Sequence, residues 1–203
     1  MRPKSAAKGL ITIIAFNHEK KMKKKIIFNE HEIEASVLRI AGEIIKRHGK
    51  MDDVVLVGIR TCGAFLAKRL QEAIGQMNAS KPPTGVLDIT LYRDDWTKIS
   101  AAPKVGKTEV PFSIDNKIVV LVDDVLFTGR TIRAAMDALI DFGRPRKIEL
   151  AILVDRGEGD RELPIMANYV GGVWNISPSE TINVYLRELG YDDHVSIEKK
   201  VTI

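Results

Sequence analysis

The sequence of 203 residues contains only one cysteine, Cys62, and few aromatic residues, 6% of the total. A single cysteine excludes an intrachain disulfide and a zinc site made of several cysteines of one chain. It is typical of a reducing compartment, so we expect a cytoplasmic protein. The sequence also lacks a transmembrane segment, because its apolar stretch at residues 10–16 is much shorter than the ~20 residues that cross a bilayer. That stretch has no convincing signal-peptidase site, so export is not expected.

The net charge of +4 is unevenly distributed along the chain. Much of the positive charge lies near the N-terminus, and the rest of the chain is nearly balanced. The basic residues of this segment are Arg2, Lys4, Lys8, Lys20, Lys21 and the lysines at 23–25. Net charge alone therefore does not indicate a nucleic-acid partner. We expect residues 1–21 to be a disordered or non-native extension, with Met22 as an alternative start of the chain.

Apolar residues recur with helical and strand periodicity along the rest of the chain. Helical spacing and short β-branched runs alternate, which predicts an α/β protein with a mostly parallel, doubly wound sheet. The expected helices are residues 31–47, residues 63–74 and a helix from about residue 132 that Gly143 ends. The expected strands are residues 54–59, 86–91, 118–122 and 148–154.

One long stretch, residues 92–116, has no strong period and contains Pro103, Gly106 and Pro111. Connections of this length in a compact domain are usually functional lids or disordered segments. Residues 98–110 have few apolar anchors, so we expect a mobile lid there in the free protein.

Two adjacent carboxylates, Asp123 and Asp124, follow the expected strand 118–122. Their burial would be costly unless a ligand needs them, and ligands of open α/β sheets bind beyond the carboxyl ends of the strands. Ionised carboxylates accept hydrogen bonds from hydroxyl groups, so the pair fits a diol.

The next residues lead directly into the following helix. Thr128, Gly129, Arg130 and Thr131 provide two hydroxyls and several backbone amides at a helix N-terminus, which favours an anion such as phosphate. A diol beside a phosphate is the pattern of a ribose 5-phosphate.

The stretch "VVLVDDVLFTGRTIRAA" resembles the phosphoribosyl-pyrophosphate (PRPP) signature of type I phosphoribosyltransferases. From Met22 onward, "LVGIRTCGAFLAKRL", "DITLYRDD", "GRPRKIELAILVDRG" and "RELPIMANYVG" resemble the bifunctional pyrimidine-operon regulators, the PyrR family. Members of that family are uracil phosphoribosyltransferases and, in some bacteria, RNA-binding attenuators. The resemblance implies a type I phosphoribosyltransferase fold over residues 22–203, with a flexible catalytic loop and a small hood at about residues 155–180.

The resemblance also implies the substrates, PRPP and uracil, and the products, UMP and pyrophosphate. Asp123 and Asp124 would hold the ribose hydroxyls and bind Mg²⁺, mostly through water. The 5-phosphate would be held by Thr128, Gly129, Arg130 and Thr131. A homo-oligomer, a dimer or larger, is expected as well.

Further roles follow from the same resemblance. Arg60 and Thr61 would belong to the pyrophosphate loop, where Gly63 permits a close backbone approach. Arg93 and Asp94 would act from the catalytic loop, with Arg93 stabilising the leaving pyrophosphate and Asp124 completing the catalytic set. The hood residues would read the uracil edge through their backbone groups; these residues are Asp155, Arg156 and Gly157.

Simpler explanations compete with several of these assignments. "AAPKVGKT" formally spells a relaxed phosphate-binding loop, but no strand closely precedes it and no helix follows, so we reject it. Arg60 could be a surface ion-pair partner, and Asp94 could serve solubility. Cys62 is better explained as a small space-filling residue than as a nucleophile, since no histidine is near it in sequence.

The chain departs from the family where RNA contacts are expected. Leu38 and Gly42 replace a Thr and a His, and Met166 and Gly172 replace basic residues. "DRGEGDRELPIM" adds two residues and two acidic side chains, and Cys62 stands where an arginine is common. RNA contact requires positive charge, so we expect binding of pyr leader RNA to be weak or absent. An RNA-binding regulator and a phosphoribosyltransferase for another base remain the alternatives to a uracil enzyme.

Overall fold

The structure, a computed structural model, describes residues 24–94 and 106–199. Within these ranges the chain forms a five-stranded sheet in the order β3-β2-β4-β5-β6, and each neighbouring pair is parallel. Its strands are Thr84–Leu87 (β3), Val54–Ile59 (β2), Ile118–Leu126 (β4), Lys147–Asp155 (β5) and Tyr169–Val173 (β6). The expected extension at residues 1–21 and most of the expected lid lie outside the described residues.

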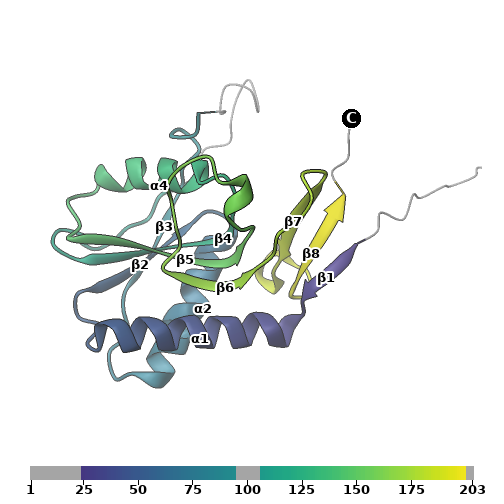
Figure 1. Ribbon diagram of the computed structural model, residues 1–203. Coiled ribbons are helices and arrows are strands. Elements are labelled where there is room, and N and C mark those ends of the chain that lie inside the picture. Colours follow the sequence, from purple (N-terminus) through teal and green to yellow (C-terminus); the bar gives the residue numbers. More distant parts are fainter. Residues whose placement is uncertain (1–23, 95–105, 200–203) are drawn as a thin grey trace, which may run out of the picture.

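Helices cover both faces of this sheet (Figure 1). Helices α1 (Glu30–His48) and α2 (Cys62–Met77) pack on one face, and α4 (Arg130–Ile140) packs on the other. The expected parallel, doubly wound α/β architecture is therefore confirmed.

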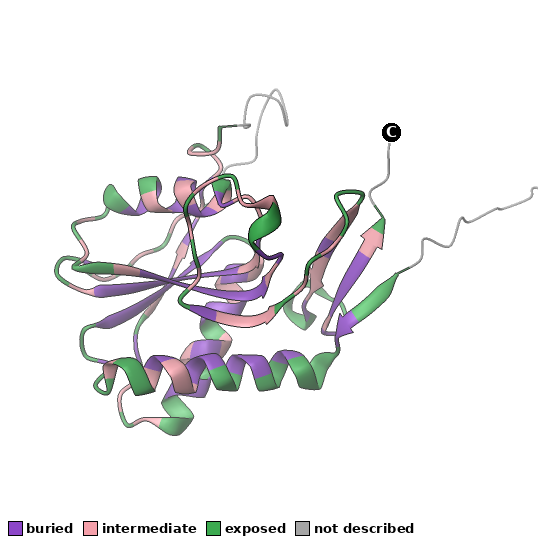
Figure 2. Cartoon of the chain, viewed as in Figure 1, coloured by how far each residue is buried: buried purple, intermediate pink, exposed green. Residues whose placement is uncertain are grey.

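The alternation of side chains along the strands creates one hydrophobic core on each face of the sheet, whose strands are largely buried (Figure 2). In β2, Val54 and Leu56 join the core under α1 and α2, whereas Val55 and Val57 join the core under α4. All six residues of β2 are buried. Each fully buried aliphatic side chain stabilises the fold by roughly 1.5 to 3 kcal/mol, so the centre of the sheet is its most stable part.

Helix α1 begins and ends close to the residues expected from the sequence. Asn29 caps it, because the Asn29 side chain accepts a hydrogen bond from the Glu32 N–H at 3.0 Å and the Glu32 carboxylate accepts from the Asn29 N–H at 2.8 Å. Gly49, with φ of +64°, ends it. These reciprocal bonds define the start of the helix at Glu30.

Two expected strand boundaries were wrong. Strand β4 does not end at Val122 but continues through the acidic pair, since Asp123 pairs with Ile152 and Leu126 with Asp155 of β5. Strand β3 ends at Leu87, four residues earlier than expected, because the Asp88 side chain accepts the Thr90 N–H at 2.8 Å and turns the chain.

A second, antiparallel sheet lies beside the first, in the order β1-β8-β7. Its strands are Lys25–Phe28 (β1), His194–Lys199 (β8) and Glu180–Tyr185 (β7). Two short 3-10 helices, Glu158–Asp160 (η1) and Arg187–Leu189 (η2), complete the elements. The range expected for the hood, residues 155–180, does not coincide with this sheet, because β6 within that range pairs with β5.

Arg69 of helix α2 connects the two parts of the molecule. Its guanidinium binds the Asp193 carboxylate at 2.7 and 2.9 Å and the Glu188 carboxylate at 2.5 and 2.8 Å. Burial alone would raise the pKa of Asp193, but hydrogen bonds from Arg69 and the Arg187 N–H outweigh this and lower it below the ordinary 3.8. The ionised, paired Asp193 therefore stabilises the folded state.

We predict that Arg69→Met lowers the free energy of unfolding at neutral pH by about 3 kcal/mol, because it leaves the buried Asp193 charge without its partner. A carboxylate with a lowered pKa stabilises the fold above its ordinary pKa and loses this effect as the pH falls below it. The difference between variant and wild type should therefore shrink below pH 3.8. Urea denaturation at neutral pH and below pH 3.8 measures the difference in the free energy of unfolding between variant and wild type. Arg133→Met, which removes an exposed ion pair on α4, is the control. Equal stability of Arg69→Met and wild type would contradict the prediction.

Candidate functional site

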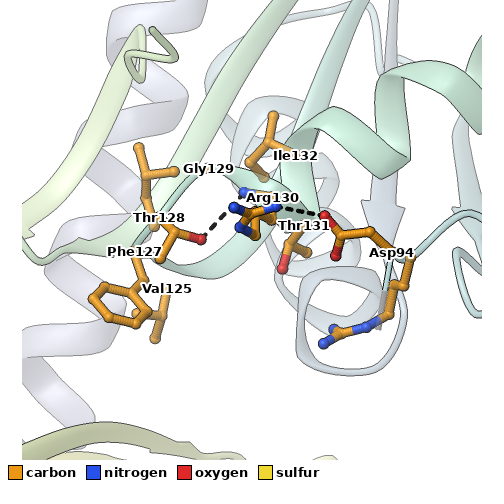
Figure 3. Close-up of a pocket in the computed structure, with 10 residues that line it drawn as sticks. Asp94, Val125, Phe127, Thr128, Gly129, Arg130, Thr131 and Ile132 are labelled. Atoms are coloured by element: carbon orange, nitrogen blue, oxygen red, sulfur yellow. Dashed lines mark hydrogen bonds and ion pairs between the residues drawn. The ribbon is translucent and has the colours of Figure 1, made fainter. Parts of the chain in front are cut away.

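A cavity of about 300 Å³ lies at the carboxyl ends of the parallel strands (Figure 3). Arg93 and Asp94 line it together with the chain from the end of β4 into α4, residues 125–132. In an open parallel sheet this edge is where ligands bind. The structure thus brings Thr128, Gly129, Arg130 and Thr131, called the phosphate turn below, to one cavity with the two expected loop residues, Arg93 and Asp94.

The acidic pair lies in β4 directly before this cavity. Asp124 faces the start of α2, because the Cys62 thiol donates a hydrogen bond to its carboxylate. Asp123 is 6% exposed, and the positive charge of Arg93 acts on it. The pair therefore borders the cavity without lining its wall.

Glycine at position 63 allows helix α2 to begin directly against β4. A Cβ on Gly63 would overlap the Val122 carbonyl oxygen and would lie 3.1 Å from the Asp123 Cα. The close approach expected at Gly63 is thus an approach to this strand. It places Cys62, the first residue of α2, beside Asp124.

Burial raises the pKa of Asp123, and the neighbouring charge of Asp124 raises it further. The pKa of Asp124 is also raised by burial, although hydrogen bonds from the Cys62 thiol and from the Val125 N–H at 2.8 Å oppose the shift. Burial, with the Asp124 charge next, raises the pKa of Cys62 to about 12. Cys62 therefore stays a thiol that fills space and donates to Asp124, which argues against a nucleophile.

The phosphate turn has the geometry of an anion site at a helix start. Gly129 has φ of +91°, a left-handed conformation that favours glycine, and α4 begins at the next residue. Thr128 Oγ1 accepts the Arg130 N–H at 3.3 Å. The Arg130 guanidinium binds the carboxylates of Asp94 and Glu162, both at 2.6 Å, as Figure 3 shows for Asp94. Glu162 was not singled out from the sequence.

Arg60 lies at the end of β2, and its peptide bond to Thr61 is cis. Its guanidinium donates to the Lys107 carbonyl at 2.9 Å and lies 3.9 Å from the Asp88 carboxylate. Asp88 also accepts the Gly106 N–H at 2.8 Å. Arg60 and Asp88 together hold the chain where it returns to the sheet after the undescribed residues.

Sequence reasoning missed Asp88, although the available signal was the one used for the acidic pair. It is a carboxylate directly after a buried strand. Its pKa is lowered, because hydrogen bonds from Thr90 and Gly106 and the charge of Arg60 outweigh the effect of burial. Asp88 is therefore ionised and suited to anchoring backbone amides.

The segment expected to read the base uses much of its backbone within the protein. The Arg156 N–H donates to the Leu126 carbonyl at 3.0 Å, and the Gly157 N–H donates to Asp155 Oδ1 at 2.8 Å. The Arg156 guanidinium packs 3.7 Å over the Phe127 ring. The Asp155 carbonyl in turn accepts the Trp174 N–H at 2.8 Å, so the backbone groups left to read a base are the Arg156 and Gly157 carbonyls, with Asp155 Oδ2 as a further acceptor.

The described residues contain no helix that is long and apolar enough to cross a membrane. They also contain no cluster of three or more metal-binding side chains. A metal bound at the acidic pair would therefore need further oxygen ligands from a bound molecule or from water.

Comparison with known proteins identifies similar sequences and folds. Residues 23–176 match the family model described as the phosphoribosyl transferase domain. The bifunctional protein PyrR of Desulfosudis oleivorans is 51% identical over 175 residues, 86% of this chain and 96% of the relative. The bifunctional protein PyrR of Chloroflexus aurantiacus is 53% identical over 173 residues, 85% of this chain and 94% of the relative.

Solved structures agree at the level of the fold. A hypoxanthine phosphoribosyltransferase from Staphylococcus aureus matches with a TM-score of 0.65 at 22% identity, over 90% of this chain and 95% of that chain. The type I phosphoribosyltransferase fold expected from the sequence is confirmed.

We predict that Asp124→Asn lowers kcat/KM for phosphoribosyl transfer by roughly a hundredfold or more, and Asp123→Asn by less, while neither lowers the melting temperature. The pKa of both carboxyls is raised by burial, so the ionised pair destabilises the fold at neutral pH. A neutral amide removes that cost. Steady-state kinetics and thermal unfolding measure the two effects, with the exposed Asp137→Asn as control. Normal activity in both variants would exclude a role for the pair.

Proposed function

The chain belongs to the phosphoribosyl transferase family and, within it, to the family of bifunctional PyrR proteins. On this premise we propose that it converts uracil and PRPP to UMP and pyrophosphate. The observation that carries the proposal is the placement of an acidic pair and a phosphate turn in consecutive positions at one cavity. This order matches the ribose hydroxyls and the 5-phosphate of one ligand.

In this proposal, the phosphate turn holds the 5-phosphate. Thr128, Gly129 and Thr131 contribute amides and hydroxyls, and the N-terminus of α4 adds favourable charge. The Arg130 guanidinium is shared by two carboxylates, so its role is to hold the turn and the start of the loop together. A phosphate anchored in this way fixes the ribose with respect to the acidic pair.

The acidic pair fits Mg²⁺. Two adjacent carboxylates with raised pKa values gain favourable interactions when a divalent cation binds, and hard oxygen ligands are the ligands that Mg²⁺ prefers. Asp123 and Asp124 would hold the ion largely through water, together with oxygens of PRPP. When bound, the ion neutralises charge on the pyrophosphate.

The chain's own residues favour departure of pyrophosphate from the ribose C1. The bond from C1 to the pyrophosphate oxygen breaks, the bond from C1 to uracil N1 forms, and the N1 proton is released. Arg93 lies on the cavity wall and would stabilise the negative charge that develops on pyrophosphate. Arg60 and Thr61, at the end of β2, would hold the same group from the other side.

The base would lie between the phosphate turn and the segment after β5. Phe127 lines the cavity with its apolar ring, and Asp155 offers an acceptor for a base N–H. Because this segment differs from the family pattern, a phosphoribosyltransferase for a different base is the second enzymatic candidate.

We predict that PRPP cleavage requires uracil, since the leaving group departs efficiently only when the acceptor occupies the site. Pyrophosphate release should rise at least roughly tenfold when uracil is added and should not rise with hypoxanthine. Asp124→Asn is the inactive control. Faster pyrophosphate release with hypoxanthine than with uracil would identify hypoxanthine as the substrate. No pyrophosphate release with any base would contradict the proposed function.

RNA binding is the function that the surface supports least. Leu38 and Met166 are apolar, and their exposed fractions are 37% and 76%. Basic or polar residues are typical of the family at these two positions. At Gly172 a Cβ would lie 2.8 Å from the Phe28 ring and would overlap Trp174, so a lysine does not fit there without rearrangement. Arg39, which the family also carries, donates to the Val170 and Gly171 carbonyls.

We predict that the protein binds its own pyr leader RNA no better than roughly micromolar at about 0.15 M salt, with UMP present, because phosphate contacts are missing. The combined variant Leu38→Thr, Gly42→His and Met166→Arg should bind more tightly, since a Cβ at Gly42 meets no atom within 4 Å and the other two positions are exposed. Gel-shift titration measures both. The control Ile140→Arg adds the same charge on exposed α4. Nanomolar, sequence-specific binding by the wild type would contradict this.

A further inference from the structure

The outer side of the phosphate turn, opposite the cavity, is covered by the segment Arg161 to Leu163. Arg161 Nη1 donates to the Phe127 carbonyl at 2.6 Å. The N–H groups of Glu162 and Leu163 both donate to the Thr128 carbonyl, at 3.0 and 3.2 Å. Two consecutive carbonyls of the turn are therefore fixed by one short segment.

Fixing a carbonyl also fixes the N–H of the same peptide unit. These peptide bonds are trans and planar, so the N–H points opposite to the C=O. The units that carry the Phe127 and Thr128 carbonyls carry the N–H groups of Thr128 and Gly129. Both of these residues line the cavity (Figure 3). Their N–H groups donate to no atom within residues 24–94 and 106–199.

We propose that Arg161 is a positioning residue for the phosphate site. It holds the Phe127 carbonyl outward so that the turn presents its N–H groups to the anion. It does so without touching the ligand itself. The proposal rests on the proposed function, because it assumes that the anion is the 5-phosphate of the ribose.

The same guanidinium also reaches the base side of the site. Arg161 Nη2 donates to Asp155 Oδ1 at 2.7 Å, and the two side chains are 11% and 14% exposed. Arg161 thus joins the chain after β4 to the end of β5. A planar guanidinium can hold two acceptors in a fixed arrangement, whereas an ammonium group acts as a single point charge.

Through these two contacts, Arg161 connects the protein segment proposed to bind the phosphate with the segment proposed to bind the base. Without it, the Phe127 carbonyl loses the Arg161 donor, and the Asp155 carboxylate keeps the Gly157 N–H but loses the Arg161 guanidinium. Affinity for a ligand that has only the phosphate and the ribose should then fall, and affinity for the whole nucleotide should fall at least as much.

The test compares Arg161→Met and Arg161→Lys with wild type. Calorimetry gives the Kd for ribose 5-phosphate and for UMP, and the ¹H–¹⁵N resonances of Thr128 and Gly129 report the orientation of the turn. We expect Arg161→Met to raise both Kd values roughly ten- to a hundredfold, the range for losing a hydrogen bond to a charged group. The Thr128 resonance should move in the free protein and respond less to ribose 5-phosphate, because the Thr128 N–H shares a peptide unit with the Phe127 carbonyl.

Arg161→Lys should give intermediate Kd values, because lysine retains the charge and one contact. The control Arg146→Met removes an exposed arginine at the opposite end of the sheet and should behave as wild type. Unchanged Kd values and turn resonances in Arg161→Met overturn the proposal. If that variant fails to fold, the same result in Arg161→Lys overturns it.

The outcomes separate this inference from the proposed function. Wild-type binding of ribose 5-phosphate without any uracil-dependent turnover would reject the uracil assignment and leave the role of Arg161 to be decided by its own variants. Failure of the wild type to bind either ligand would reject both.

Discussion

The contact between Gly63 and strand β4 is the constraint on which the site depends. Helix α2 begins where a Cβ would overlap the Val122 carbonyl, so the end of β2 and the acidic pair are forced together. This contact buries the pair, and burial raises the pKa of both carboxyls. The same contact therefore brings the two halves of a ligand site together and leaves two carboxylates that are unfavourable without a ligand or cation.

Such a site is tolerated because the surrounding sheet is rigid. The two hydrophobic cores bury every residue of β2 and the residues of β4 up to Asp123. The free energy gained by this apolar burial offsets the cost of holding the two carboxylates in the sheet. Functional sites commonly retain unfavourable charges that a stable scaffold holds in place. The buried pair should therefore contribute to catalysis and not to stability.

The sequence was sufficient to predict four of the five strands of the parallel sheet, its helices and a ligand position at the strand ends, because periodicity and strand-end chemistry are local; strand β6 was not among the expected strands. Strand β2 and helix α1 were predicted to within a residue at each end. Strand β4 was predicted too short, because aspartates were taken to end a strand that backbone pairing with β5 continues. The second sheet was missed; its β1–β8 pair joins the two ends of the chain, whereas β7 and β8 are neighbours in sequence. The contacts of Asp88 with Gly106 and of Arg161 with Phe127 were missed as well, because these partners are 18 and 34 residues away in sequence.

The segment with two additional residues shows why a departure from the family pattern need not remove a function. The added residues form η1, closed by the Arg161 N–H donating to the Glu158 carbonyl at 3.0 Å and by the Arg156–Asp160 ion pair at 2.8 Å. The extra length is absorbed before Arg161, which still reaches Phe127 and Asp155. The Asp160 carboxylate and the Glu158 carbonyl thus help to close η1 directly before Arg161. We therefore propose that this one segment both weakens RNA binding and keeps Arg161 in place.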